Sequence, residues 1–230
     1  VTCSPATAVP GVPVLVSVRS ARPRAVVSAS SALLSGMGSG WLTMFTVTKP
    51  GDIVIVDYTF YDATGNPILT TNQQIYTQTV EKSRFIIFAR QLSMTAGQNL
   101  TKSIYPVSIY TASSGWKPEF ALFSVEYDAI NQALIGMRTG DQKHILLPEI
   151  SMAQLWSAEK LNSSGVKMSD LHIGDLLPMG VSDNPEALIT NSTITYTRIG
   201  EVTNITDEGI IVDSGYPAVD ISIVSINPNS

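Results

Sequence analysis

The stretch 130–148 most constrains what this chain can fold into, because it predicts a short helix followed directly by an apolar strand. The helix carries four apolar side chains at helical spacing: Ile130, Ala133, Leu134 and Met137. It is predicted to stop near Gly140, where a Gly-Asp turn leads into the apolar run 145–148. A helix with one apolar stripe is most economically buried against a sheet, so this stretch indicates a helix packed on strands.

A second segment, 53–60, predicts the strand that would receive this helix. Its β-branched and aromatic residues are dense enough for a largely buried strand. Alternation places one set of side chains on a single face: Val54, Val56, Tyr58 and Phe60. The following residues 63–66, Ala-Thr-Gly-Asn, predict a turn. Together the two segments indicate an α+β fold in which a curved sheet covers a short helix.

Three motifs connect these segments to a known family. They are Lys49-Pro-Gly-Asp52, the strand sequence Gly51-Asp-Ile-Val-Ile-Val-Asp-Tyr-Thr-Phe60, and Ala133-Leu-Ile-Gly-Met-Arg-Thr-Gly-Asp141. On these residues the chain resembles the FKBP-type peptidyl-prolyl isomerases. The resemblance implies a curved antiparallel sheet wrapped on a short helix, and an activity that accelerates cis/trans exchange of X-Pro bonds.

The order of the later segments resembles one subfamily. Strand-like blocks at 168–177, 195–202 and 208–213 precede the closing strand predicted at 220–226. This arrangement is similar to the SlyD-like two-domain FKBPs, in which a small β-rich chaperone domain is inserted in the flap before the last strand. It implies an extension at 1–47, an FKBP-like domain at 48–149 plus 217–230 with a long insertion at 72–117, and an inserted domain at 150–216.

The resemblance also implies where a pocket would lie. Tyr58 matches the strand tyrosine of the family and Ile130 takes the position at the foot of the helix, while Phe120, Phe123 and Tyr127 would complete an apolar lining. Two family motifs are substituted. Ile68 and Leu69 stand where Phe-Asp is expected, and Ala153, with its two neighbours, stands where Ala-Tyr-Gly is expected.

These substitutions bear on activity. Rotation about X-Pro has a barrier of about 18–20 kcal/mol, and an apolar pocket that favours the twisted bond lowers it without a nucleophile. Loss of the tyrosine donor implied at Ala153 should weaken substrate binding by about 0.5–1.5 kcal/mol. The resemblance therefore implies a weak isomerase and folding helper, with a catalytically retired binding or structural module of a membrane or surface complex as the alternative.

The expected partners are unfolded or proline-containing polypeptides. The inserted domain carries more apolar side chains than so small a unit is expected to bury, and these would bind extended peptides: Leu171, Ile173, Leu176, Leu177 and Met179. The insertion 72–117 is too long for a plain loop, and its apolar content indicates that it packs. It could cover the pocket, offer a surface to a partner, or elaborate the edge of the sheet.

Composition excludes several other functions. A net charge of -5 argues against nucleic acid, which requires a basic footprint. The single cysteine, Cys3, allows no internal disulfide and no cysteine-type zinc site, and His144 and His172 are expected to have structural roles. No metal or cofactor motif is present in the sequence.

Two features indicate a location outside the cytoplasm. Residues 25–47 form a charge-free stretch long enough to cross a membrane, preceded by Arg19, Arg22 and Arg24. Its serine and glycine content fits an extension of a soluble protein equally well. Four sequons provide acceptors for N-glycans: Asn99, Asn162, Asn191 and Asn204. They favour an extracytoplasmic protein, with membrane association through 25–47.

Overall fold

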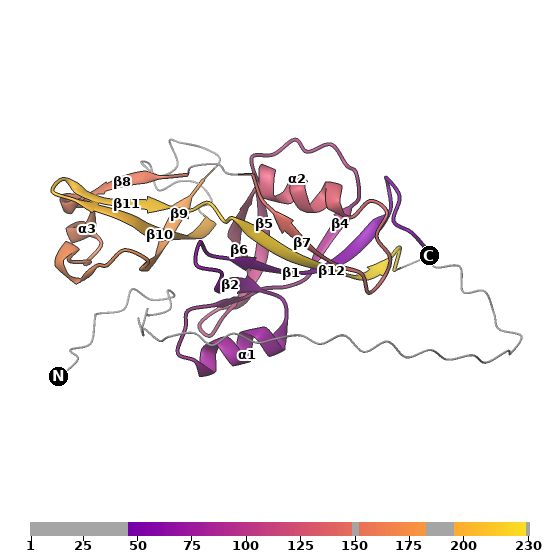
Figure 1. The fold of residues 1–230 in the computed structure, drawn as a ribbon, viewed down its shortest axis with the longest axis horizontal. Helices are drawn as coiled ribbons and strands as arrows, with labels where there is room; N and C mark the ends of the chain where they lie inside the picture. Colours follow the sequence, from indigo (N-terminus) through magenta and orange to yellow (C-terminus); the bar gives the residue numbers. More distant parts are fainter. Residues whose placement is uncertain (1–45, 149–151, 183–195, 229–230) are drawn as a thin grey trace, which may run out of the picture.

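The computed structural model describes residues 46–148, 152–182 and 196–228. Within these ranges the chain is a mixed α+β protein that consists mostly of strands, arranged in two sheets with few helices. Figure 1 shows the first sheet at the centre and right of the view, with one helix above it and another below, and the second sheet at the left. The α+β fold class expected from the sequence is confirmed at this level.

The first sheet is built around a long strand near the start of the described residues. Its members are β1 Ile53–Tyr61, β2 Pro67–Thr70, β3 Ile87–Phe88, β4 Leu92–Thr95, β7 Gln142–Leu146 and β12 Ala218–Ile226. They lie in the order β3, β2, β1, β12, β7, and β4 pairs with the first half of β1. The neighbours are antiparallel except for β2 and β3, which are parallel. The closing strand thus lies beside β1.

Side-chain alternation in β1 follows the prediction. Val54, Val56, Tyr58 and Phe60 expose at most 1% of their surface, and all four belong to the core of the first sheet. Full burial of apolar side chains of this size contributes roughly 1.5–3 kcal/mol each. The alternate residues of β1, among them Asp57, lie on the opposite face, so the strand separates an apolar side from a polar side.

The predicted amphipathic helix is α2, Ser124–Ala133, which lies on the core side of the first sheet. Its N-terminus is capped because the Glu126 carboxylate accepts a hydrogen bond from the Phe123 N–H at 2.9 Å. The end expected near Gly140 is wrong. The chain leaves the helix after Ala133, because Gly136 adopts a positive φ of 84° and its N–H donates to the Thr48 carbonyl.

The predicted turn at 63–66 is present and joins β1 to β2. The Asp62 carboxylate organises it by accepting from the Thr64 and Asn66 backbone N–H groups at 2.9 and 2.7 Å. Gly65 takes a positive φ of 78°, which a side chain would disfavour. After β2 comes helix α1, Gln73–Glu81, and the side-chain oxygen of Asn72 caps its N-terminus. This helix lies on the side of the sheet opposite α2 (Figure 1).

The insertion 72–117 is structured. Besides α1, β3 and β4 it contains β5, Ile104–Thr111, and the first part of β6, Gly115–Phe123, which form an antiparallel hairpin. β4 extends the first sheet, so part of the insertion elaborates that sheet. The hairpin has a second role, because side chains of β5 and β6 enter the same core as β1 and β2.

The second sheet combines the hairpin with the segment that was expected to form an inserted domain. Its further strands are β8 Gln154–Ser157, β9 Leu176–Val181, β10 Tyr196–Thr206 and β11 Gly209–Asp213. The order is β5, β6, β10, β11, β8, with β9 paired to β10. Two short helices, α3 Ala158–Ser163 and the 3-10 helix Met168–Asp170, pack beside it, and Leu161 and Trp156 enter a second core.

Within the second sheet, β6 of the hairpin runs parallel to β10, with Phe120 opposite Thr197. Segment 152–216 is therefore continuous with the hairpin of the insertion through sheet pairing. It lies between β7 and β12 in the chain, as the order of the predicted strands required. The result is an elongated molecule with one core under each sheet (Figure 1).

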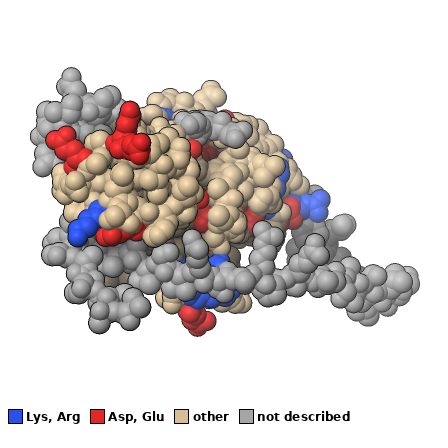
Figure 2. Space-filling model, turned by 60° about the vertical axis from the view of Figure 1, so that its left-hand side comes forward, with Lys and Arg blue, Asp and Glu red and all other residues tan. Residues whose placement is uncertain are grey.

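The predicted membrane segment 25–47 lies almost wholly outside the described residues. Among the residues that the structure describes, no helix is both long and apolar enough to cross a bilayer. Figure 2 shows that uncharged residues make up most of the visible described surface, in keeping with the low share of charged residues, 14%.

Candidate functional site

The residues expected to form an isomerase pocket are largely brought together, but in a closed core. Five of them expose at most 1% of their surface and belong to one cluster: Tyr58, Ile68, Leu69, Phe120 and Ile130. β1, β2, β6 and α2 supply them. The structure thus brings these five residues together, and their burial leaves a substrate no entry in this conformation.

The β5–β6 hairpin closes this region. Its side chains Val107, Ile109 and Leu122 are buried in the same cluster as Tyr58. Phe120, which was expected to line a pocket, is itself a residue of this hairpin. The hairpin thus shares one core with the residues expected to form the pocket.

Tyr58 has an unusual environment within this core. Its ring packs edge-on against Phe60 with centroids 5.7 Å apart, and no described residue hydrogen-bonds to its hydroxyl. Burial raises the pKa of Tyr58, and the charge of Asp57 raises it further. An unpaired buried hydroxyl costs about 1–3 kcal/mol, so Tyr58 is a polar group kept in an apolar place at the expense of stability.

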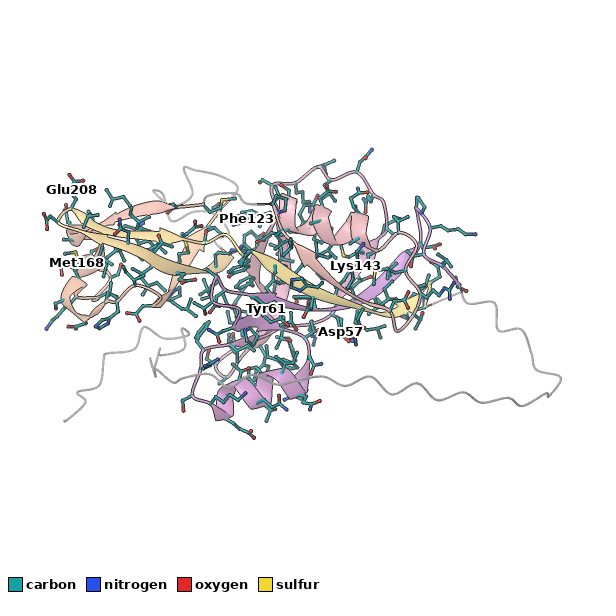
Figure 3. The ribbon with its side chains drawn as sticks, viewed as in Figure 1. Asp57, Tyr61, Phe123, Lys143, Met168 and Glu208 are labelled. Carbon is teal, nitrogen blue, oxygen red and sulfur yellow. The ribbon has the colours of Figure 1, made fainter. Side chains whose placement is uncertain are left out.

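The remaining pocket residues are not members of this buried cluster, although Tyr127 packs against it. Tyr127 is half-buried and stacks on Tyr105 with ring centroids 4.1 Å apart. Phe123 lies at the junction of α2 with the second sheet (Figure 3), where its ring is 4.5 Å from the Arg198 guanidinium. Ala153 is exposed, just before β8. The structure therefore does not bring Phe123 and Ala153 to the same place as Tyr58.

The five residues expected to bind peptides differ in accessibility. Leu177 and Met179 are buried in the second core, so the expectation that they are displayed is wrong for these two. β9 alternates, and its pairing with β10 directs both inward. Leu171 and Leu176 are half-buried against the cores, and Ile173 exposes 66% of its surface.

A buried ion pair joins helix α2 to the second sheet, and it was not predicted. The Arg198 guanidinium on β10 binds both carboxylate oxygens of Glu126 on α2 and also donates to the carbonyls of Ala121 and Ser214. Both side chains are almost fully buried. These contacts use all five N–H groups of the arginine. Only one feature of the sequence indicated this ion pair, which is that an arginine stands within an apolar strand segment.

Aromatic rings complete the environment of this pair. The guanidinium lies 3.8 Å from the ring centroid of Tyr216, whose hydroxyl donates to the Ile199 carbonyl at 3.1 Å. Burial lowers the pKa of Arg198, but the charges of Glu126, Tyr216 and Asp213 and the hydrogen bond to Glu126 together outweigh it, so the pKa is raised overall. Burial also raises the pKa of Tyr216 to about 12. The arginine therefore stays charged at every ordinary pH, and its pairing with Glu126 connects α2 to the second sheet.

The open site lies on the other face of the first sheet. A groove of about 380 Å³ is bounded by the start of α1 and by three strands, β1, β12 and β7. Its lining residues are Asp57, Tyr58, Thr59, Thr71, Asn72, Ile75, Gln142, Lys143, His144, Asp220, Ile221 and Ser222. Figure 3 shows Asp57 and Tyr61 on β1, on the part of the sheet next to α1.

Sheet register assembles the polar network of this groove. Asp220 on β12 lies opposite Thr59 on one side and His144 on the other. Its carboxylate accepts from the Tyr61 hydroxyl at 2.6 Å, and its second oxygen lies 2.6 Å from His144 Nδ1. Because an ionised carboxylate only accepts, Nδ1 carries the proton and Nε2 remains an acceptor while the ring is neutral. Burial, followed by the bond to Asp220, raises the pKa of Tyr61.

The groove can therefore bind polar groups of a ligand, with carboxylate, imidazole and hydroxyl groups side by side. Asp57 is held in place by the Thr71 hydroxyl at 2.8 Å and by the Gln91 amide at 3.0 Å. Among the described residues, no group of three or more metal-binding side chains is suited to a metal ion. The sequence predicted a structural role for His144, and its contact with Asp220 could not be foreseen from their positions.

A search against models of protein families gives no match to this chain, and a search of curated proteins gives no similar sequence.

Proposed function

We propose that this protein is a polypeptide-binding module whose first sheet and helix follow an FKBP-like plan, and that it binds extended chains at the open edge of that sheet. One contrast carries the proposal. The side chains expected to form an isomerase pocket are buried in a closed core, whereas β7 is an edge strand beside an open polar groove.

The edge of β7 has the hydrogen-bonding groups that such binding requires. Leu147 N–H donates to the Pro217 carbonyl at 2.9 Å, and Ile223 N–H donates to the Asp141 carbonyl at 3.1 Å. In an antiparallel ladder alternate residues face the partner, so odd-numbered residues of β7 face β12. The even-numbered residues direct their N–H and C=O groups away from it: Gln142, His144 and Leu146.

The surroundings of this edge favour an extended polypeptide as the ligand. Within the described residues β7 pairs with β12 alone, and a strand added to a free edge gains backbone hydrogen bonds regardless of its sequence. Leu146 exposes 76% of its surface and offers an apolar contact. Asp57 and Asp220 in the adjacent groove offer acceptors for polar or basic side chains.

A single-residue comparison tests the proposal. Leu146→Pro removes one outward N–H but leaves the hydrogen bonds to β12 intact, whereas Leu146→Ala removes only the side chain. We expect Leu146→Pro to weaken binding of a short extended peptide about tenfold relative to Leu146→Ala, measured by calorimetry, because one backbone hydrogen bond is lost. Equal affinities of the two variants would contradict binding along this edge.

Isomerase activity is the second candidate, and the unpaired hydroxyl of Tyr58 favours it. Displacement of the β5–β6 hairpin would open the core and let this hydroxyl donate to a substrate carbonyl. Exchange NMR on an X-Pro peptide distinguishes the two candidates. We expect the uncatalysed exchange time of tens to hundreds of seconds. Acceleration that disappears in Tyr58→Phe would establish the isomerase and contradict a permanently closed core.

We place the protein outside the cytoplasm. Three of its four sequon asparagines, Asn99, Asn162 and Asn204, are exposed, while Asn191 lies outside the described residues. Exposure is what a glycan requires. Mass spectrometry of the protein from its native source tests this directly, since the proposal expects glycans on Asn99 or Asn204. Unmodified asparagines at all four positions would contradict it.

A further inference from the structure

Four aromatic side chains form a row on the surface where α1, β3 and the β5–β6 hairpin meet. They are Tyr76, Phe88, Trp116 and Tyr110, in this spatial order. The ring centroids are 5.1 Å apart for the first pair and 5.6 Å apart for each of the next two pairs. We refer to these four residues as the aromatic strip.

The aromatic strip is accessible, unlike the aromatic residues of the first core. Tyr110 exposes 51% of its surface, and the other three residues are half-buried. None of the four is a member of either core cluster of the described residues. The Arg90 guanidinium lies 4.8 Å from the ring centroid of Trp116, so the strip also carries a positive charge. Its rings support one another, so little side-chain freedom is lost on binding.

An accessible row of rings with indole and phenol donors suits a polyproline II segment. Such a segment has no internal hydrogen bonds, so its carbonyls are open to N–H and O–H donors, and its proline rings pack on aromatic faces. Every third residue lies on the same side, about 9 Å apart. Alternate rings of the aromatic strip are at most about 11 Å apart, since neighbouring centroids are 5.1–5.6 Å apart. Two prolines three residues apart therefore match its spacing.

Residues 1–45, which lie outside the described residues, contain a sequence with this proline spacing. Pro10-Gly-Val-Pro13 places two prolines three positions apart. Residues 14–45 separate it from the first described residue, and an extended chain of that length reaches about 100 Å. The connection thus restricts it to no particular face. Covalent attachment supplies an effective concentration in the millimolar range, which suffices for a contact of low intrinsic affinity.

We infer that the aromatic strip binds the Pro10-Gly-Val-Pro13 segment of its own chain. The interaction does not depend on the peptide-binding edge proposed above, since the strip and β7 share no residue. It holds the N-terminal segment against α1, and a proline-rich partner would have to displace it to use the same rings.

The only cysteine of the sequence, Cys3, permits a direct test in the full chain. A nitroxide attached there lies seven residues from Pro10 and broadens NMR signals near the bound segment. We expect selective broadening of the Trp116 indole and the amides of Phe88 and Tyr110. The control variant Pro10→Ala/Pro13→Ala alters no described residue and should abolish this selectivity, as should Tyr110→Ser on the other side of the contact.

Two results would overturn the inference. One is weak, uniform broadening that the Pro10→Ala/Pro13→Ala variant leaves unchanged, which would show that the segment does not reside on the strip. The other comes from mixing nitroxide-labelled chains with isotope-labelled Cys3→Ser chains that carry no nitroxide. Selective broadening there would identify a second copy as the source of the segment. Addition of a free peptide with the same four residues should relieve the broadening if the strip is the binding site.

Discussion

Tyr58 and Tyr61 are three residues apart on β1, and strand alternation therefore places their side chains on opposite faces of the sheet. Tyr58 points into the core, where its hydroxyl has no hydrogen-bond partner among the described residues. Tyr61 lies on the other face, where its hydroxyl donates at 2.6 Å to Asp220, a residue that lines the groove. The core side is closed by the β5–β6 hairpin, and the groove side is open beside the edge strand β7.

The core face of β1 contributes to stability, whereas the groove face offers groups that can bind a ligand. In a long strand, alternate side chains lie on opposite faces of the sheet. One strand can therefore supply apolar residues to a core and polar residues to an open surface. The side chains of the core face are buried, and this face is closed to a ligand. The groove face contributes polar groups whose hydrogen bonds remain accessible. Substitutions on the two faces should therefore differ in both size and sign.

The largest difference is expected from truncation of a residue on each face. Phe120→Ala should lower the free energy of unfolding by about 3–5 kcal/mol, because the ring is fully buried and the cavity cannot close. Leu146→Ala, at an exposed site on β7, should change it by less than about 0.5 kcal/mol. Urea unfolding of both variants measures the two values. A small loss in Phe120→Ala would mean that the hairpin is not closed over the core.

The ion pair between α2 and the second sheet should give a loss of similar size. Arg198→Met leaves Glu126 buried without its partner, and we expect destabilisation of about 3–5 kcal/mol. The double variant Arg198→Met/Glu126→Gln should recover part of this, because no uncompensated charge remains. A double variant as unstable as the single one would show that the arginine acts through packing on Tyr216 and Phe123 rather than through its charge.

Alkaline pH should weaken the fold through its buried tyrosines. The pKa values of Tyr58, Tyr61 and Tyr216 are raised in the folded state, that of Tyr216 to about 12. Above the unfolded value of about 10 the unfolded chain releases these protons while the folded chain retains them, so stability falls as pH rises. The loss per buried tyrosine is up to about 1.4 kcal/mol per pH unit. Chemical unfolding at pH 9 to 11 should show a smaller slope for Tyr58→Phe.

The smallest expected changes in stability come from removing one tyrosine hydroxyl on each face. They test the comparison most finely, because the two changes should have opposite signs. Tyr58→Phe removes an unpaired buried hydroxyl and should leave stability unchanged or raise it by up to about 1–3 kcal/mol at pH 7. Tyr61→Phe removes a hydrogen bond to Asp220 and should lower stability by about 0.5–1.5 kcal/mol. Two losses of equal size in thermal unfolding would indicate that Tyr58 has a partner, such as a buried water.

The local parts of this fold could be predicted from the sequence. The alternation in β1, the turn at 63–66 and the apolar stripe of α2 each depend on residues close in the chain. The end of α2 was misplaced because Gly136 and Gly140 are both suitable terminators, and the contact of Gly136 with Thr48 decides between them. A contact between residues so distant in the chain leaves no local pattern.

The candidate site could be predicted only in part for the same reason. The clustering of Tyr58, Ile68 and Ile130 was implied by resemblance, but its closure by the hairpin depends on the long-range packing of β5 and β6. The pairs that define the unforeseen sites join residues 72 and 76 positions apart, Glu126 with Arg198 and His144 with Asp220. Composition and spacing give no indication of these pairings.

Chemical-shift mapping with an extended X-Pro peptide tests the central claim, that the core face is closed and the edge beside the groove binds. The backbone amides of the full chain report both faces in one titration. The account predicts shifts at Gln142, His144 and Leu146, with none at Ile68 or Ile130. Shifts centred on Tyr58, Ile68 and Ile130, with β7 unaffected, would contradict it and place the binding site in the core that the hairpin covers.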